Sequence, residues 1–501
     1  MNFTSFHFVL FFFITILLGH ILKGRNQRVF LLAASYYFYG VFNTSYLFLI
    51  WISTLWDFIS ALGIEASGKK KNHSPLDLTL SERFLSAVPA KVWLFISIAL
   101  NLSLLGYFKY TNFGIEIFND LYPLGDSVFS WPNASILLPV GISFYTFQSM
   151  SYTIDVYRGI LTPRKNIIDF ALYVAFFPQL VAGPIVRATT FLKELDNRLP
   201  INRDDIIVGT TRIVVGFFRK LVLSDNLALM VNHVFAHPAS VNPVDVWIAS
   251  LAFGFQIYLD FAGYTDIARG VARLFGFEFE INFHYPMAAK NITEHWSRWH
   301  ISLTTWIRDY IYIPLGGSRM GEFRTYTNIF LTWFFAGIWH GPAYHFVVWG
   351  IWQGVMISAH RLFQRTSLRK TLNEKGGFFY DFFTRAFTIF NLIFGFIWFR
   401  AENMTTATIL QGRLFGINNL PLLLKGEAGG LADTFPPAMY LSYTGMLAFL
   451  FAYEYFFYRY QLEFFWKKEN QWKLIFILTA MIFSIVVFSP PETPSFMYFQ
   501  F

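Results

Sequence analysis

Apolar runs long enough to cross a lipid bilayer recur along the whole chain. A transmembrane helix needs about 20 mostly apolar residues to cross a hydrocarbon core of about 30 Å. Because some of the runs are expected to be re-entrant, the pattern predicts about eleven true spans. The predicted helices cover 5–22, 29–43, 46–64, 92–113, 136–153, 168–186, 206–223, 245–268, 327–340, 343–361, 384–400, 438–457 and 472–489.

The segments between these runs indicate the orientation of the chain. The predicted loop 65–90 carries three consecutive lysines, and Arg164 and Lys165 lie in another short polar turn. Clustered basic residues are typical of cytoplasmic loops. The segment 114–135 has acidic residues but no lysine or arginine, so it is predicted to face the outside. The segment 401–437, which contains glycine and proline, is predicted to be irregular.

Composition places the chain among the membrane proteins. Hydrophobic residues make up 55% of it and charged residues 14%, whereas a soluble domain has about a quarter charged residues. The net charge of +8 is attributed to basic cytoplasmic loops, so no nucleic-acid partner is expected. We predict an all-α polytopic protein with one membrane domain over 1–501. In it, 1–135 supplies N-terminal spans, 136–363 the core and 364–501 C-terminal spans.

A polar and aromatic segment at 275–326 interrupts the apolar pattern. It is too polar to face lipid and too aromatic for an ordinary loop. Asn291 followed by Glu294 resembles a capping box, which marks the start of a helix. The pattern predicts one helix from Asn291 to about Tyr312, ended by Pro314 and the glycines that follow it.

One face of this predicted helix is aromatic. Glu294 and Arg298 are four residues apart and can pair on it. Two interpretations stay open: an amphipathic helix anchored in the membrane interface by its tryptophans, or the wall of a cytoplasm-facing substrate funnel with His300 inside it. Helical spacing brings together the large apolar residues Trp296, Trp299, Leu303 and Trp306.

The apolar stretch 328–358 contains a helix breaker beside a histidine. A single helix of this length would be about 46 Å long, well over the thickness of the hydrocarbon core. Pro342 lacks a backbone donor and disfavours helix at Gly341, so a break is predicted near 340–343. His340 would lie at the break, at membrane depth and facing protein, as either a functional or a structural histidine. His345 is predicted to be structural.

Several kinds of chemistry lack support in the sequence. The chain has no cysteine, which excludes thiolate catalysis and disulfides. His295 and His300 are five residues apart and do not share a helix face, and no His-Glu-x-x-His pattern occurs, so no metal site is predicted. Walker-type glycine loops and the G-x-S-x-G and G-x-G-x-x-G patterns are also absent from the sequence.

Six segments of the chain form a distinctive set: HWSRWHISLTTWIRDYIYIPLGGSR (295–319), GIWHGPAYHFVVWGIWQG (337–354), GISFYTFQSMSYTIDVYRG (141–159), FFPQLVAGPIVR (176–187), FGFIWFRAENMTTA (394–407) and FMYFQF (496–501). Together they resemble the bacterial branch of the membrane-bound O-acyltransferase (MBOAT) family, which includes alginate O-acetyltransferase-like proteins. The resemblance covers about 140–501 and extends to the N-terminal third only by hydropathy. One departure is Gln353, where family members often have histidine, so no catalytic role is predicted there.

The resemblance implies a ring of helices around a thin centre crossed by a tunnel, and transfer of an acyl group from a thioester to a hydroxyl. The family's invariant histidine falls on His340, and its second conserved histidine falls on His300. The donor, acetyl-CoA or an acyl carrier thioester, would enter from the cytoplasm, with no bound cofactor. A periplasmic acetyltransferase partner would pass the acetyl group to an exopolysaccharide or cell-wall polymer outside the cell inner membrane.

This chemistry gives the candidate residues expected roles. His340 would take the proton of the acceptor hydroxyl, because an imidazole has a pKa of about 6.5. His300 would orient the acceptor, or donate to the thioester oxygen or the departing thiolate. Arg298 and Arg308 would hold the phosphates or pantetheine of the donor, unless they pair with Glu294 and Asp309. The tryptophans would exclude water from the site. The predicted binding residues are Trp296, Arg298, Trp299, Arg308 and Trp339.

Alternatives to acetyl transfer remain open. Within the same class, the chain could transfer D-alanine to teichoic acid. From another class, a transporter or export scaffold would also have discontinuous helices with buried polar groups. A lipid acyltransferase would need a side door for a long chain, and the sequence does not define the width of a tunnel.

Overall fold

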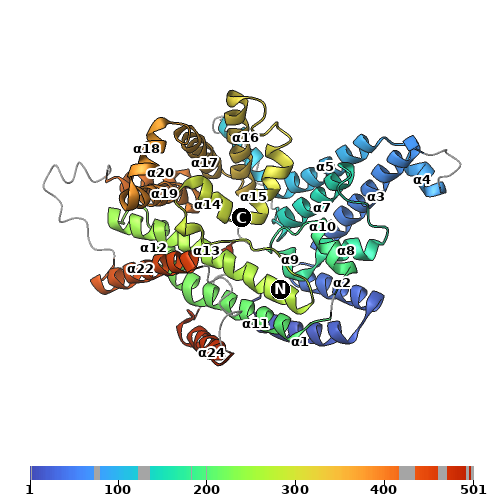
Figure 1. Ribbon diagram of the computed structural model, residues 1–501, viewed down its shortest axis with the longest axis horizontal. Helices are drawn as coiled ribbons and strands as arrows, with labels where there is room; N and C mark the ends of the chain where they lie inside the picture. The colour runs from blue at the N-terminus through green and yellow to red at the C-terminus, as the bar shows by residue number, and fades with distance from the viewer. Residues whose placement is uncertain are drawn as a thin grey trace, which may run out of the picture. The chain divides into compact units, whose positions relative to one another are not determined.

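The computed structural model describes residues 1, 3–72, 79–121, 136–181, 183–198, 200–416, 435–460, 471–491 and 496–497. Within these ranges every regular element is helical (Figure 1). The helices form two compact units, and the chain passes between them more than once. Unit 1 contains 1–213 and 265–280, and unit 2 contains 214–264 and 281–501.

Unit 1 is built from the N-terminal helices. Its helices α3, α5 and α7 pack on one another, and α8 packs on α2 and α3. The helices are α1 (Phe6–Ile21), α2 (Gly24–Gly40), α3 (Tyr46–Asn72), α4 (Leu80–Leu85), α5 (Ala90–Leu105), the π-helical turn η2 (Gly106–Tyr110), α6 (Thr111–Leu121), α7 (Ile142–Tyr157), α8 (Ile167–Ala175), α9 (Phe177–Leu180), α10 (Ala188–Asp196) and most of α11 (Arg203–Phe217).

Unit 2 holds the polar segment from residue 281 onward and both candidate histidines. Its helices α16 and α17 lie side by side, and α17 also packs on α14 and α19 (Figure 1). Its elements are η3 (Phe218–Ser224), α12 (Asp225–Ala236), most of α13 (Pro243–Leu274), η4 (Pro286–Ala288), α14 (Ile292–Arg298), α15 (Ile301–Ile307), η5 (Arg308–Tyr312), α16 (Glu322–His340), α17 (Tyr344–Phe363), α18 (Ser367–Lys375), α19 (Gly377–Arg400), α20 (Met404–Leu414), α22 (Pro437–Tyr460) and α24 (Gln471–Phe488).

Most predicted runs coincide with helices, but α4, α10, α12 and α18 lie between the predicted runs, and three further differences follow. The helix predicted at 46–64 continues to Asn72, because lysine is a good helix former. The run 168–186 divides into α8 and the short α9 instead of one span. Part of the predicted irregular stretch 401–437 is the helix α20, whose first turn is capped by the side chain of Asn403.

Some sequence expectations lie outside the described residues. They concern 73–78 of the predicted cytoplasmic loop, 122–135 of the predicted external segment, 417–434 of the stretch predicted to be irregular, and 498–501 of the C-terminal ending.

Five of the described helices are long and apolar enough to cross a membrane. They are Tyr46–Lys70, the joined α5 to α6 region Ala90–Leu121, Pro243–Leu274, Gly377–Arg400 and Gln471–Phe488. A bilayer core needs about 20 apolar residues per helix. These helices therefore support a polytopic membrane protein, in agreement with the composition.

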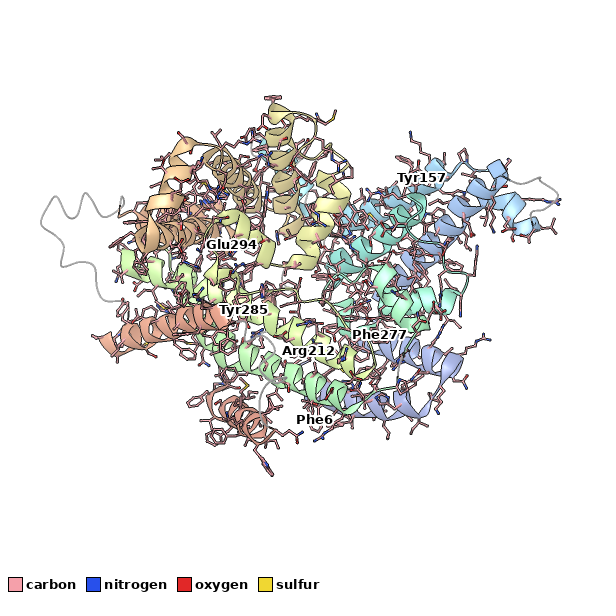
Figure 2. All side chains as sticks on the ribbon, viewed as in Figure 1. Phe6, Tyr157, Arg212, Phe277, Tyr285 and Glu294 are labelled. Atoms are coloured by element: carbon pink, nitrogen blue, oxygen red, sulfur yellow. The ribbon has the colours of Figure 1, made fainter. Side chains whose placement is uncertain are left out.

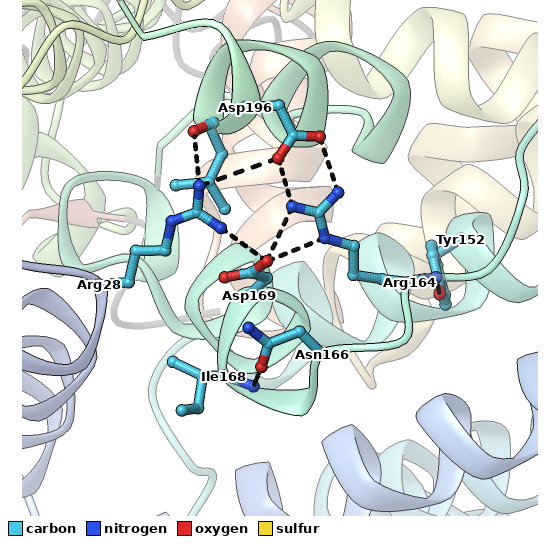
Figure 3. A network of polar contacts seen from close by, with 8 residues as sticks. Arg28, Tyr152, Arg164, Asn166, Ile168, Asp169 and Asp196 are labelled. Carbon is cyan, nitrogen blue, oxygen red and sulfur yellow. Dashed lines mark hydrogen bonds and ion pairs between the residues drawn. The ribbon is translucent and has the colours of Figure 1, made fainter. Parts of the chain in front are cut away.

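Unit 1 contains a network of ion pairs around the buried carboxylate of Asp169 (Figure 3). Asp169 Oδ2 accepts hydrogen bonds from Arg28 Nη1 at 2.8 Å and from Arg164 Nε at 3.0 Å. Arg164 also pairs with Asp196, and this hydrogen bond holds the pKa of the Asp196 carboxyl below its ordinary value. The network ties α2, α8 and α10 to the turn that precedes α8, so it fixes the position of that basic turn.

Unit 2 contains a fully buried triad of charges. Lys220 Nζ lies 2.8 Å from Asp225 Oδ1 and 2.7 Å from Asp260 Oδ1, and all three side chains are at most 2% exposed. The second oxygen of Asp260 accepts a hydrogen bond from the backbone N–H of Met497 at 2.9 Å. The ring of Phe496 lies 4.8 Å from the ammonium group. The triad thus joins η3, α12 and α13 to residues near the end of the chain.

Candidate active site

The polar segment forms two short helices in place of the single predicted helix. α14 ends at Arg298 and α15 begins at Ile301, with Trp299 and His300 between them. His300 has a φ of 43°, in the left-handed region. Only His300 and Tyr285 have positive φ among the non-glycine residues that the structure describes. A left-handed non-glycine residue costs free energy, and such residues cluster at functional sites.

Asn282 stabilises the break between the two helices. Its side-chain oxygen accepts hydrogen bonds from the backbone N–H of Ser302 at 3.1 Å and from the Ser302 hydroxyl at 2.9 Å. Its backbone carbonyl accepts from the N–H of Ile301 at 2.9 Å. Asn282 was not predicted as a site residue, because a local sequence pattern does not indicate contacts between residues 18 to 20 positions apart.

The same oxygen fixes the tautomer of His300. His300 Nδ1 lies 3.3 Å from Asn282 Oδ1, which can only accept, so Nδ1 carries the proton and Nε2 carries the lone pair. His300 is 1% exposed and lies against the rings of Phe261 and Phe283, at 4.7 and 6.3 Å. It lies outside the five spanning helices, and its burial lowers the pKa of the imidazole below the ordinary value. The ring is therefore neutral at physiological pH.

The start of α14 agrees with the predicted cap. Asn291 Oδ1 accepts from the N–H of Glu294 at 2.9 Å. The returning bond of the box is displaced by one residue, because Glu294 accepts from the N–H of Lys290 instead of Asn291. Glu294 also pairs with Arg298, as predicted, and Arg298 is stacked on the ring of Tyr458 at 4.0 Å. Figure 2 labels Glu294 on α14 and Tyr285 on the segment that precedes it.

Burial of the aromatic face favours the second of the two interpretations, in which this face is enclosed by protein. Its four members are between 4% and 9% exposed, so these rings do not lie free in the membrane interface. Arg308 behaves differently, since its side chain is 58% exposed and pairs with the adjacent Asp309 at 2.8 Å. The buried members are Trp296, Trp299, Leu303 and Trp306.

The predicted break beside His340 is confirmed. α16 ends at His340, and α17 begins at Tyr344. His340 is 7% exposed and lies between aromatic rings, with Trp339, Trp349 and Phe399 at 4.9, 5.0 and 5.0 Å. Its imidazole therefore faces protein. Trp339 is buried beside it.

Close backbone contact between α16 and α17 fixes this arrangement. A Cβ atom on Gly337 would lie 2.5 Å from the carbonyl oxygen of Phe346, and one on Gly350 would lie 2.5 Å from that of Trp333. Only glycine allows such an approach. His345, predicted to be structural, is held by a 2.8 Å contact of its Nδ1 with the carbonyl of Trp398.

A continuous series of rings links the two candidate histidines. From His340 it passes through Trp349 to Trp296, at centroid distances of 5.0 and 5.7 Å. From Trp296 it continues to Trp299 at 6.3 Å, and Phe283 then joins Trp299 to His300 at 5.3 and 6.3 Å. The two histidines thus belong to one aromatic cluster without touching each other through any ring contact found among the described residues.

A cavity of about 410 Å³ lies beside this cluster. Four of its hydroxyl groups donate to backbone carbonyls of their own segments, which satisfies their hydrogen bonds within the protein. The cavity is suited to an apolar chain with a polar end near Arg308. Its lining residues are Thr293, Trp296, Ser297, Ile301, Thr304, Thr305, Ile307, Arg308, Tyr312, Ile329, Thr332, Trp333, Ala336 and Ile357.

Neither candidate histidine lines this cavity, but both are close to its walls. Ala336 lines it, and His340 follows one turn later on the same face of α16, about 6 Å further along the axis. His300 immediately precedes the lining residue Ile301. Of the five predicted binding residues, only Trp296 and Arg308 line the cavity, while Arg298, Trp299 and Trp339 do not.

The backbone strain at His300 can be measured with a pair of variants. His300→Gly and His300→Ala remove the same imidazole, but glycine adopts the left-handed conformation without strain. We expect the glycine variant to be more stable than the alanine variant by about 1 kcal/mol. Thermal unfolding of both variants in detergent checks this, and an alanine variant as stable as the glycine variant would contradict it.

Comparison with known proteins now defines the class of the chain. Residues 163–399 match the sequence model of MBOAT, the membrane-bound O-acyltransferase family. This range includes both histidines, the aromatic cluster and the cavity. Together with the relatives below, the match shows that the chain belongs to the membrane-bound O-acyltransferase family, and it is an O-acyltransferase.

The relatives cover most of the chain. It is 38% identical over 429 residues to the probable alginate O-acetylase AlgI of Pseudomonas putida, covering 84% of this chain and 82% of the relative. It is 31% identical over 422 residues to the peptidoglycan O-acetyltransferase of Helicobacter pylori, covering 79% and 75%. It is 27% identical over 245 residues to the teichoic acid D-alanyltransferase of Bacillus subtilis, covering 47% of this chain and 62% of the relative.

Proposed function

We propose that this enzyme transfers an acetyl group from a thioester to a hydroxyl, for O-acetylation of an exopolysaccharide or cell-wall polymer. The observation that carries this proposal is the position of His340. It is a buried imidazole at a helix break, one turn beyond an apolar cavity on the same face of α16. The names of the two relatives that cover most of the chain support an acetyl group as the cargo.

The proposed reaction uses His340 as a general base. The acceptor hydroxyl oxygen attacks the thioester carbonyl carbon, and His340 takes the hydroxyl proton as the carbon–oxygen bond forms. The carbon–sulfur bond then breaks, and the departing thiolate receives that proton, which returns His340 to its neutral form. Such proton transfer contributes about 10²–10⁴-fold to a rate. The surrounding rings keep water from the thioester and so limit hydrolysis.

His300 is proposed to orient the acceptor. Since Asn282 leaves the lone pair on Nε2, the neutral ring can accept a hydrogen bond from a hydroxyl group. This tautomer supports the orienting role over donation to the thioester oxygen or the thiolate. Asn282 then acts as a positioning residue for His300.

The donor is proposed to lie in the cavity beside α14 and α16. Arg308, exposed at its rim, would hold the phosphates or pantetheine of acetyl-CoA or an acyl carrier, and Trp296 would contact the donor's apolar arm. The pairing of Arg298 with Glu294 favours the structural alternative for that arginine. Trp299 and Trp339 would contribute by excluding water from the site.

The arrangement in the membrane is also part of the proposal. We place the enzyme in the cell inner membrane as a single domain over 1–501, with about eleven spans in a ring around a thin centre crossed by a tunnel. The donor enters from the cytoplasm, and an extracytoplasmic acetyltransferase partner receives the acetyl group and passes it to the polymer. The membrane family and the five long apolar helices support this topology.

A donor assay separates this proposal from its alternatives. The purified protein should transfer label from acetyl-CoA or an acetylated carrier protein to a hydroxyl acceptor, and should leave a D-alanyl carrier protein unused. Preference for the D-alanyl carrier would instead favour the teichoic acid activity suggested by the 27% identical relative. Solute flux without transfer from any thioester would favour a transporter.

A further inference from the structure

A carboxylate without a positive partner lies at membrane depth in unit 1. Asp57 is completely buried on α3, close to the middle of the spanning segment Tyr46–Lys70. Within the described ranges of the chain its contacts are hydrogen bonds, and none of them is an ion pair. A charged side chain at the centre of a bilayer is strongly unfavourable unless another charge compensates it. The carboxylate therefore needs a proton or a bound cation.

Polar atoms of α3, α5 and α7 gather around this carboxylate. Asp57 Oδ1 accepts a hydrogen bond from Ser97 Oγ at 2.6 Å, and Asn101 Nδ2 donates to the two carboxylate oxygens at 3.1 and 2.9 Å. Asn101 Oδ1 in turn lies 2.9 Å from Ser53 Oγ and 3.4 Å from Ser149 Oγ. All these side chains are completely buried, and the three helices that carry them pack on one another (Figure 1).

Three of the oxygen atoms have the spacing of a metal coordination shell, and we call them the oxygen triangle: Ser53 Oγ, Asn101 Oδ1 and Ser149 Oγ. Its edges are 2.9, 3.4 and 3.4 Å long. A hard cation of the size of sodium or calcium takes oxygen ligands at about 2.4 Å, so neighbouring oxygens of an octahedral shell lie about 3.4 Å apart. Calcium sites usually contain several carboxylates, whereas the single carboxylate of Asp57 balances one positive charge.

Two further hydroxyl groups on the same face of α3 have no hydrogen-bond partner among the residues that the structure describes. They belong to Thr54 and Ser60, whose oxygens are buried. Thr54 lies three residues before Asp57 and Ser60 three residues after it, which places both within about 60° of Asp57 around the helix axis. Buried hydroxyl groups normally have a partner, so these two indicate that a polar ligand belongs at this face.

We propose that unit 1 binds a sodium ion between α3, α5 and α7, with Asp57 as its counter-charge and the oxygen triangle among its ligands. The ion neutralises the carboxylate at membrane depth and links the three helices. Both candidate histidines belong to unit 2, so this proposal does not depend on the proposed function. The site uses neutral oxygens in place of the histidine, cysteine or carboxylate clusters of other metal sites, of which the described residues contain none.

The test measures thermal unfolding of the full-length protein in detergent, in sodium, potassium or choline chloride at equal ionic strength. The midpoint should lie at least about 3 °C higher in sodium than in choline, because an ion that binds only the folded state stabilises it. Potassium should have a smaller effect, since the oxygen triangle is too narrow for the larger ion. Equal midpoints in all three salts, or equal stabilisation by potassium and sodium, would overturn the proposal.

Asp57→Asn distinguishes a bound ion from a purely structural polar contact. This variant should have the same midpoint in sodium and choline, and its midpoint in choline should be no lower than that of the wild type, because no uncompensated carboxylate remains. Asp245→Asn is the matched control, since Asp245 is a fully buried aspartate that accepts from the N–H of Asn242 at 3.0 Å at the start of α13. The control should keep the full response to sodium. A sodium response retained in Asp57→Asn would overturn the proposal.

Two serine variants of α7 keep the proposal testable if Asp57→Asn does not fold. Ser149→Ala removes one oxygen of the triangle and should raise the sodium concentration for half of the stabilisation by at least about tenfold. Ser151→Ala is its control, because the Ser151 hydroxyl is also buried but donates to the carbonyl of Gln148 at 2.8 Å. Equal sodium responses of the two variants would show that the triangle does not hold an ion.

Discussion

Replacement of His340 by alanine should lower the rate of acyl transfer by about 10²–10⁴-fold, the usual contribution of a general base. The ring lies at the end of α16 among three aromatic side chains, so its loss removes the proposed base and leaves the helix break formed by Gly341 and Pro342. The measurement is the acetyl content of secreted polymer in cells that carry the variant, with the amount of membrane-inserted enzyme determined in parallel.

His345→Gln is the matched control for this experiment. His345 is a buried histidine five residues away, held by the carbonyl of Trp398, and glutamine can keep that hydrogen bond. We expect the control to retain most of the transfer. Normal acetylation by a well-expressed His340→Ala enzyme would exclude His340 as the base.

Exchange of Lys220 for methionine should destabilise the protein by about 3–5 kcal/mol, because it leaves buried carboxylates without their cation. Asp225 and Asp260 both lie within 2.8 Å of the ammonium group and are almost inaccessible to water. Conversion of both aspartates to asparagine together with Lys220→Met should recover much of this loss. The measurement is the midpoint of thermal unfolding in detergent.

An exposed ion pair gives the contrast for this prediction. Arg365 pairs with Glu322 on the surface, where both side chains are about half exposed. Surface pairs contribute little to stability, so Arg365→Met should leave the midpoint nearly unchanged. Equal midpoints for Lys220→Met and the wild type would show that the triad does not hold η3, α12 and α13 together.

The sequence predicted the break at His340 but not the break at His300, for a physical reason. Pro342 predicts the first break from the local sequence, because proline lacks a backbone N–H donor. The second break contains neither glycine nor proline. His300 is held in the left-handed region by hydrogen bonds that its own segment donates to Asn282, a residue 18 positions earlier. Tertiary contacts of this kind leave no trace in helical periodicity, so a single helix was the natural prediction.

Most of the helices and part of the candidate site could be predicted from the pattern of hydrophobic and polar residues. Hydrophobic runs located the helices because a bilayer demands long apolar segments. The helical spacing grouped the Trp residues on one face and left open whether that face meets the membrane interface or protein, and their burial supports the second interpretation. The cavity lining was not predictable, because it combines α14, α15, α16 and Ile357 of α17. The contact of Trp296 with Gln353 joins residues 57 positions apart and was missed for the same reason.

The direct contact of α16 and α17 through Gly337 and Gly350 has a consequence for engineering this enzyme. Any larger residue at either glycine would push the two helices apart, because its first carbon meets a carbonyl oxygen. Such a shift would separate the proposed base on α16 from the ring of Trp349 on α17, which now lies 5.0 Å from it. Variants with altered donor preference should therefore be sought among the ring side chains, with the spacing of the helix pair left untouched.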